Sequence, residues 1–139
     1  MKYYLDDTYE YDFLLIGISC HEKDYRISWA LNQNLSLQLV KEKEGLEVII
    51  NKTNELSLHS VYTYKNTETH NEFILINNRS SVGFLIPEKQ QADYLLIIKE
   101  NIDFSSELFL RRIKNINFVL TAFEIPVEQL KSKDRKSVV

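Results

Sequence analysis

The sequence predicts an α+β fold: a single domain with a largely antiparallel β-sheet and two main helices packed on one face. The length of 139 residues is close to the commonest size of one domain. Eight Tyr and seven Phe accompany only three Gly and two Pro, a balance that favours strands over tight glycine turns. The periodicity changes in the order strand, helix, strand, several strands, helix, strand, which is typical of α+β domains.

The first predicted helix lies between two strands. Residues 9–18 become continuously apolar, as expected of a central strand that is buried on both faces. Ser19 and Glu22 have the S-x-x-E spacing of a capping box, which predicts a helix over about 22–34. The predicted core face of this helix consists of Ile27, Ala30, Leu31 and Asn34, widened by Tyr25 and Trp29. Alternating Leu residues then predict a half-buried strand over 35–41.

The rest of the chain reads as a meander of strands followed by a helix and a last strand. Apolar and β-branched runs predict a hairpin of 46–50 with 56–64, and further strands at 72–76, 82–86 and 94–98, the last of them a core strand. A helix over 106–114 ends in cations that suit its C-terminal dipole. A final strand over 116–122 precedes Pro126, which stops it.

No repeat, low-complexity tract or linker divides the chain, so we expect one α+β domain over 1–126. Residues 127–139 are rich in Lys and Arg and contain little to bury, which predicts a mobile polar tail.

Composition disfavours several classes of function and location. A net charge of -3 lacks the positive footprint of a general nucleic-acid binder, so nucleic acid is not the expected partner. No window approaches the roughly 20 apolar residues that a membrane-spanning helix needs, and the first residues show no export signal. The single Cys20 fits a reducing compartment. Together these features predict a cytoplasmic protein that does not cross a membrane.

One motif stands out. Ile86-Pro87-Glu88, followed by Asp93-Tyr94 and an apolar run, resembles the defining motif of the bacterial IPExxxDY family of small proteins. Four residues separate Glu88 from Asp93 here, whereas the family's name implies three. The resemblance extends over nearly all 139 residues, and it implies no activity, substrate, cofactor or catalytic residue. It makes Pro87, Glu88, Asp93 and Tyr94 the candidate binding residues.

Two interpretations of this motif stay open. Glu88 and Asp93 flank a short loop, from which two carboxylates can converge on a cation or one can serve as an acid or base. In the structural interpretation, which we favour, these carboxylates bond loop amides while the Tyr94 ring packs and its hydroxyl finds a polar partner.

Other candidate sites are weaker. The three His residues and Cys20 lack C-x-x-C or H-x-x-x-H spacing, so no metal site is expected. Cys20 at a helix N-terminus is a candidate nucleophile, although burial as a small core residue is the favoured interpretation. No phosphate-binding glycine loop or G-x-S-x-G elbow occurs, and no cofactor is expected.

We therefore expect a non-catalytic binding or adaptor domain that contacts an unknown protein partner or forms a homodimer through a sheet edge. The alternative is a small enzyme that uses the loop carboxylates Glu88 and Asp93, with Tyr94 or His59. Arg111, Arg112 and Lys114 either form a solvated helix face or contact an acidic partner.

Overall fold

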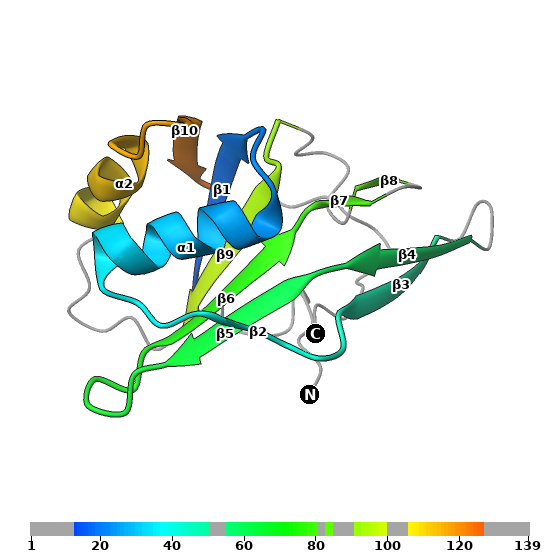
Figure 1. Ribbon diagram of the computed structural model, residues 1–139, viewed down its shortest axis with the longest axis horizontal. Helices are drawn as coiled ribbons and strands as arrows, with labels where there is room; N and C mark the ends of the chain where they lie inside the picture. The colour runs from blue at the N-terminus through cyan, green and yellow to red at the C-terminus, as the bar shows by residue number, and fades with distance from the viewer. Residues whose placement is uncertain (1–12, 51–54, 81–82, 85–90, 100–105, 127–139) are drawn as a thin grey trace.

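The computed structural model describes residues 13–50, 55–80, 83–84, 91–99 and 106–126 (Figure 1). In chain order its elements are β1 (Phe13–Cys20), α1 (Asp24–Leu35), β2 (Val40–Lys41), β3 (Leu46–Ile50), β4 (Glu55–His59), β5 (Val61–Lys65), β6 (Glu72–Asn77), β7 (Arg79–Ser80), β8 (Gly83–Phe84), β9 (Tyr94–Lys99), α2 (Ser106–Lys114) and β10 (Val119–Glu124). The α+β class is confirmed, and the second helix has the predicted bounds.

The main sheet has six strands in the order β10-β1-β9-β6-β5-β2. Every neighbouring pair in it is antiparallel. Two smaller antiparallel pairs, β3–β4 and β7–β8, lie toward the end of the molecule away from α2 (Figure 1). The predicted antiparallel sheet is therefore confirmed. The hairpin predicted for 46–50 with 56–64 is confirmed in part, because its second strand is divided at Ser60 into β4, which pairs with β3, and β5, which belongs to the main sheet.

β1 is an interior strand, because it pairs with β9 on one side and with β10 on the other. Its side chains alternate between the two faces of the sheet. Leu15 joins one apolar core cluster, whereas Ile16 and Ile18 join the other. A strand that must fill two cores needs a continuous apolar run, which is the pattern that predicted it.

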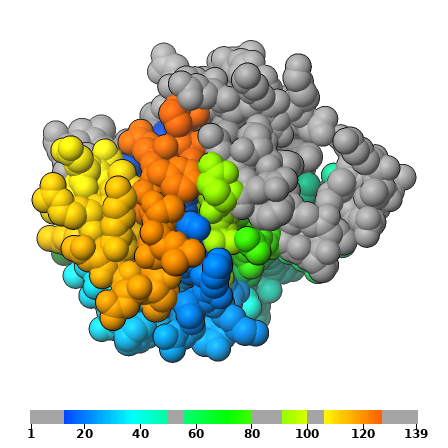
Figure 2. Space-filling view, turned by 90° about the horizontal axis from the view of Figure 1, so that it is seen from above, coloured from blue at the N-terminus to red at the C-terminus, as the bar shows by residue number. Residues whose placement is uncertain are grey.

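Both helices pack on the same face of the sheet. Ile27 and Leu31 of α1 and Ile113 of α2 are fully buried in the same cluster as Leu96 of β9. The two helices also contact each other, and α2 packs beside β10, seen in yellow and orange in Figure 2. The prediction of two helices on one face is confirmed.

The β3–β4 hairpin contributes to the core on the opposite face of the sheet. Leu46 and Val48 of β3 pack in one cluster with Ile74, Ile76 and Leu95 of the main sheet. β4 runs almost directly into β5, with Ser60 between them. The hairpin is thus an extension of β5, and its Leu46 and Val48 cover part of the sheet face opposite the helices.

The predicted capping box is wrong. Ser19 belongs to β1, and α1 begins only at Asp24, with Lys23 as its N-cap and no side-chain cap. Glu22 instead forms an ion pair with Arg26, at 3.5 Å between the carboxylate and Nε. The S-x-x-E spacing is present, but β1 continues through Ser19 and Cys20, so Ser19 does not cap the helix.

The predicted helix face is partly wrong as well. Ile27, Ala30 and Leu31 are buried as expected, but Tyr25 and Trp29 are 59% and 60% exposed. Asn34 is exposed, because the helix continues by one residue and Leu35 takes the buried position. Both aromatic rings therefore lie on the solvent side of α1.

The strand predicted over 35–41 is reduced to two residues, Val40–Lys41. Leu39 is buried but lies outside the ladder, because the Asn32 side chain bonds both its N–H, at 2.9 Å, and its C=O, at 3.2 Å. The last strand also begins later than predicted, since turns after α2 bond Ile116 to Ile113 and Val119 to Ile116.

Pro87, Glu88 and the predicted tail 127–139 lie outside the described residues. In the part that the structure describes, neither helix has the length and apolar character to cross a bilayer.

Candidate functional site

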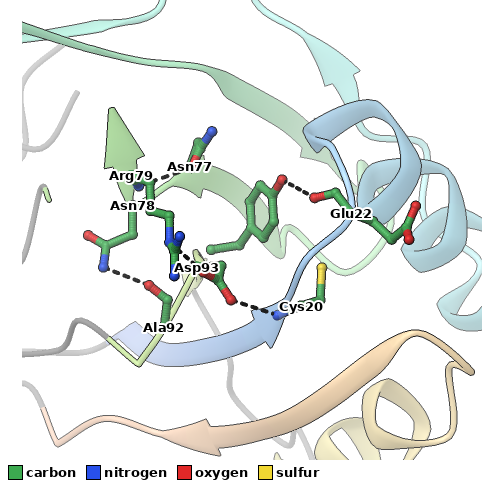
Figure 3. Close-up of polar contacts among 8 residues, drawn as sticks. Cys20, Glu22, Asn77, Asn78, Arg79, Ala92 and Asp93 are labelled. Carbon is green, nitrogen blue, oxygen red and sulfur yellow. Dashed lines mark hydrogen bonds and ion pairs between the residues drawn. The ribbon is translucent and has the colours of Figure 1, made fainter. Parts of the chain in front are cut away.

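The described half of the motif, Asp93 and Tyr94, lies where β9 begins beside the end of β1 (Figure 3). Asp93 is only 5% exposed. Its N–H donates to the Ile18 carbonyl, at 2.9 Å, and its side-chain Oδ2 accepts the N–H of Cys20, also at 2.9 Å. The pairing of β1 with β10 shifts register between Ser19 and Cys20. The carboxylate therefore satisfies a backbone donor at an irregularity of β1.

A cation accompanies the buried carboxylate. Nε of Arg79 lies 2.6 Å from Oδ1 of Asp93, so each carboxylate oxygen has its own donor. The Asp93 side chain is 7% exposed and that of Arg79 is 55% exposed. A buried charge is tolerated only when it is paired and hydrogen-bonded, and Asp93 meets both conditions. The exposed guanidinium places the positive end of the pair in water.

Asn78 fastens the segment before β9. Its side chain is completely buried, and Nδ2 donates to the Ala92 carbonyl at 2.8 Å. Its backbone N–H donates to the carbonyl of Asp93 at 2.9 Å. Asn78 and Arg79 therefore bond Ala92 and Asp93, as Figure 3 shows. The two hydrogen bonds of Asn78 hold the backbone at Asp93 in place independently of the contacts of the Asp93 side chain.

Tyr94 connects β9 to the segment before α1. Its hydroxyl donates to the carbonyl of Glu22 at 2.5 Å, and the residue is 4% exposed. Burial raises the pKa of the Tyr94 phenol, and the nearby Cys20 and Asp24 raise it further. The hydroxyl therefore stays protonated and remains a hydrogen-bond donor. The ring packs in the core cluster beneath α1, as the structural interpretation of the motif expects.

Cys20 is 1% exposed, and burial raises the pKa of its thiol. The reactive form of cysteine is the thiolate, which a raised pKa disfavours. This environment fits a small core residue rather than a nucleophile. Among the described residues, no three His, Cys, Asp or Glu side chains are grouped so that they could hold a metal ion.

The structure also contains a polar cluster of which the sequence indicated only His59. The Ser57 hydroxyl lies 2.6 Å from Nε2 of His59, and Nδ1 of His59 lies 2.7 Å from the Asn77 carbonyl. Because a carbonyl only accepts, Nδ1 carries the proton and Nε2 accepts from the hydroxyl. Burial lowers the pKa of His59, which keeps the ring neutral.

This serine and histidine have the hydrogen-bond order of a catalytic pair, but both residues are only 2% exposed. A nucleophile has to meet its substrate, so the burial favours a structural role. The cluster ties β4 to the end of β6. The signal available in the sequence was the i, i+2 spacing of Ser57 and His59, which places both on one face of a strand.

The structure therefore brings Asp93 and Tyr94 together with Cys20, Asn78 and Arg79, and it places His59 on a separate cluster under the hairpin. Glu88, the other carboxylate of the motif, lies outside the described residues. The chain matches no family model, and no curated protein or solved structure is significantly similar to it.

Proposed function

We propose that this protein is a non-catalytic binding domain that contacts a second copy of the chain through the outer face of its β3–β4 hairpin. We call this surface the hairpin face and define it as Ile49, Leu56 and Leu58. The proposal depends on one observation: the β4 strand turns its polar side chains inward and its leucines outward.

The inversion is plain from the exposure of alternate residues. Ser57 and His59 are 2% exposed, whereas Leu56 is 49% and Leu58 is 60% exposed. A strand with one face exposed to solvent normally has the opposite pattern, with apolar side chains inward and polar ones outward. Burying a serine and a histidine requires that both be hydrogen-bonded, which the Asn77 carbonyl makes possible. The fold thus leaves two leucines in water.

The apolar residues of the hairpin face are adjacent. Ile49 lies directly opposite Leu56 in the register, and Leu58 lies two residues farther along β4 on the same face. Glu47, which pairs with Leu58, is the charged neighbour. An apolar surface with little charge is suited to an isologous contact, in which the same surface meets itself about a two-fold axis. Three side chains form a small interface, so we expect a weak and concentration-dependent dimer.

The enzyme alternative receives less support. An acid or base must reach a substrate, but both oxygens of Asp93 already have donors and the residue is 5% exposed. A structural role, in which Asp93 holds the start of β9 against the end of β1, accounts for every contact that Asp93 makes with described residues.

Two further expectations accompany this proposal. Membership of the IPExxxDY family is supported by Ile86-Pro87-Glu88 and Asp93-Tyr94, and a cytoplasmic location is supported by the single, buried Cys20.

Sedimentation velocity over a wide range of protein concentration tests the proposal. The wild type should shift from monomer toward dimer as concentration rises. Leu58→Glu should remain monomeric, because the new carboxylate lies opposite Glu47 in a surface that must lose water. Leu120→Glu is the matched control, since Leu120 is 64% exposed but lies on β10.

Circular dichroism confirms that each variant is folded. A wild type that stays monomeric at every concentration, or a Leu120→Glu variant that loses the dimer together with Leu58→Glu, contradicts the hairpin face as the contact surface.

A further inference from the structure

A cavity of about 370 Å³ lies where the C-terminal end of α1, the turn between β5 and β6, and helix α2 meet. These three segments share the end of the molecule opposite the hairpin (Figure 1). The volume falls within the ~300–1,000 Å³ of typical small-molecule sites. The site is therefore distinct from the hairpin face, and the inference drawn from it does not depend on the proposed function.

The inner wall of the cavity is apolar and rigid. Leu35, Leu37, Phe73 and Phe109 contribute to it, and none of them is more than 8% exposed. The rings of Phe73 and Phe109 stack with centroids 5.9 Å apart, and the ring of Tyr64 also stacks with Phe73 at the same separation. A wall of stacked rings keeps its shape, so a ligand meets an apolar surface that is already formed.

The rim is polar on the side of the β5–β6 turn. Asn66 and Thr69 line it there, and the Asn66 side chain holds the turn by accepting the N–H groups of Glu68 and Thr69. The N–H of Asn66 also bonds the Asn71 carbonyl across the turn. The opposite rim belongs to α2, where Leu108 is 45% exposed.

Arg112 is the only charged residue among the described residues that line the cavity. It follows Leu108 by one helical turn, so both side chains lie on the same side of α2. A guanidinium beside an apolar wall matches a ligand that has an anionic group and an apolar body. The C-terminal end of α1, at Leu35, carries partial negative charge and therefore disfavours an anionic group, so the carboxylate of such a ligand is expected at Arg112 and not at this end.

We propose that this cavity binds a small organic anion, with the carboxylate on Arg112 and the apolar chain against Phe73 and Leu37. The apolar wall supplies affinity, and the single cation supplies the preference for one charge type. The turn residues Asn66 and Thr69 border the site, so a further polar group on a ligand would meet polar side chains there.

Titration of the full chain with octanoate, followed by amide chemical shifts in NMR spectra, tests this site. Octanoate should produce saturable shifts at residues that line the cavity, with Ser36, Phe73 and Phe109 among them. Octylammonium has the same chain and the opposite charge, and it should bind at least tenfold more weakly. Acetate has the charge without the chain and should produce no saturable shift in the same concentration range.

Two exposed arginines on the same helix provide a matched pair of variants. Arg112→Gln should weaken octanoate binding about tenfold, which corresponds to about 1.4 kcal/mol. Arg111→Gln should bind as the wild type does, because Arg111 does not line the cavity. Leu108→Glu should also abolish octanoate binding, since it places a carboxylate on the apolar rim. The same spectra report whether each variant is folded.

The proposal is overturned if octylammonium binds as tightly as octanoate, if Arg112→Gln and Arg111→Gln bind alike, or if the shifts scatter away from the cavity. These results bear only on this site, because the hairpin face shares no residue with it.

Discussion

Replacing Asp93 with Ala tests whether the second half of the motif is structural. The substitution removes the acceptor of the Cys20 N–H and the partner of Arg79 at once. We expect the variant to remain folded but to unfold at clearly lower urea concentration than the wild type.

The expected loss follows from the two contacts. A buried N–H left without an acceptor costs about 1–3 kcal/mol. Because the Arg79 side chain is 55% exposed, solvent screens its ion pair, which adds at most about 1 kcal/mol. The sum, about 1–4 kcal/mol, is a large part of the roughly 5–15 kcal/mol that stabilises a typical domain. Asp93→Asn should lose only about 1–2 kcal/mol, because its amide oxygen can still accept the Cys20 N–H.

Urea unfolding monitored by far-ultraviolet circular dichroism measures these differences, provided that the slope with denaturant is the same in all variants. Glu42→Ala removes a carboxylate that is exposed, so it should change the free energy of unfolding by less than about 0.5 kcal/mol. If Asp93→Ala is as mild as this control, or if Asp93→Asn is the more damaging of the two, the carboxylate does not hold β1 and β9 together.

Three further predictions concern other contacts. Burial lowers the pKa of His59 from 6.5, so its neutral form stabilises the fold above about pH 6.5. On acidification below that pH, the free energy of unfolding should fall by up to about 1.4 kcal/mol per pH unit until the folded-state pKa is passed. Urea unfolding between pH 7.5 and 5 measures this slope, and a slope unchanged in His59→Gln would contradict the assignment. Gly45→Ala should destabilise the hairpin by about 1–3 kcal/mol, because the new Cβ would lie 2.4 Å from the His59 carbonyl oxygen. Thermal unfolding measures this loss, and a variant with the midpoint temperature of the wild type would contradict the prediction. Tyr94→Phe should cost about 1 kcal/mol through loss of the bond to the Glu22 carbonyl, and equal urea midpoints for the two proteins would show that this bond contributes nothing.

The regular elements could be predicted because their signals are local. Residues 94–98 are apolar without interruption, and the structure pairs β9 on both sides. The helix predicted over 106–114 is present with these bounds; Phe109 and Ile113 are buried, and cations occupy its last turn. Length, periodicity and charge at a helix end are all properties of neighbouring residues, so no tertiary information was required.

The errors lie where a distant partner decides the local structure. Ser19 and Glu22 satisfy a capping pattern, but the Cys20 N–H bonds a carboxylate that follows it by 73 residues, and the strand extends. Leu39 alternates like a strand residue, but the Asn32 side chain takes the place of a neighbouring strand.

The candidate site shows the same limit. The motif pointed to Asp93 and Tyr94, whereas their partners come from two other parts of the chain. Cys20 and Glu22 lie at the end of β1 and just after it, and Arg79 follows β6. The outward leucines of β4 were equally hidden, because alternation reveals that two faces differ but not which face is buried.

The strand order of the main sheet has a consequence for protein synthesis. β1 has β9 and β10 as its neighbours, and its last residue, Cys20, precedes Asp93 by 73 residues. At roughly 5–20 residues per second, a ribosome needs about 4–15 s to produce that stretch. During this interval the apolar sequence Phe13–Cys20 has left the ribosome without either neighbour and is open to capture by a chaperone or by another nascent chain. The main sheet therefore closes late, when most of the chain has already been made.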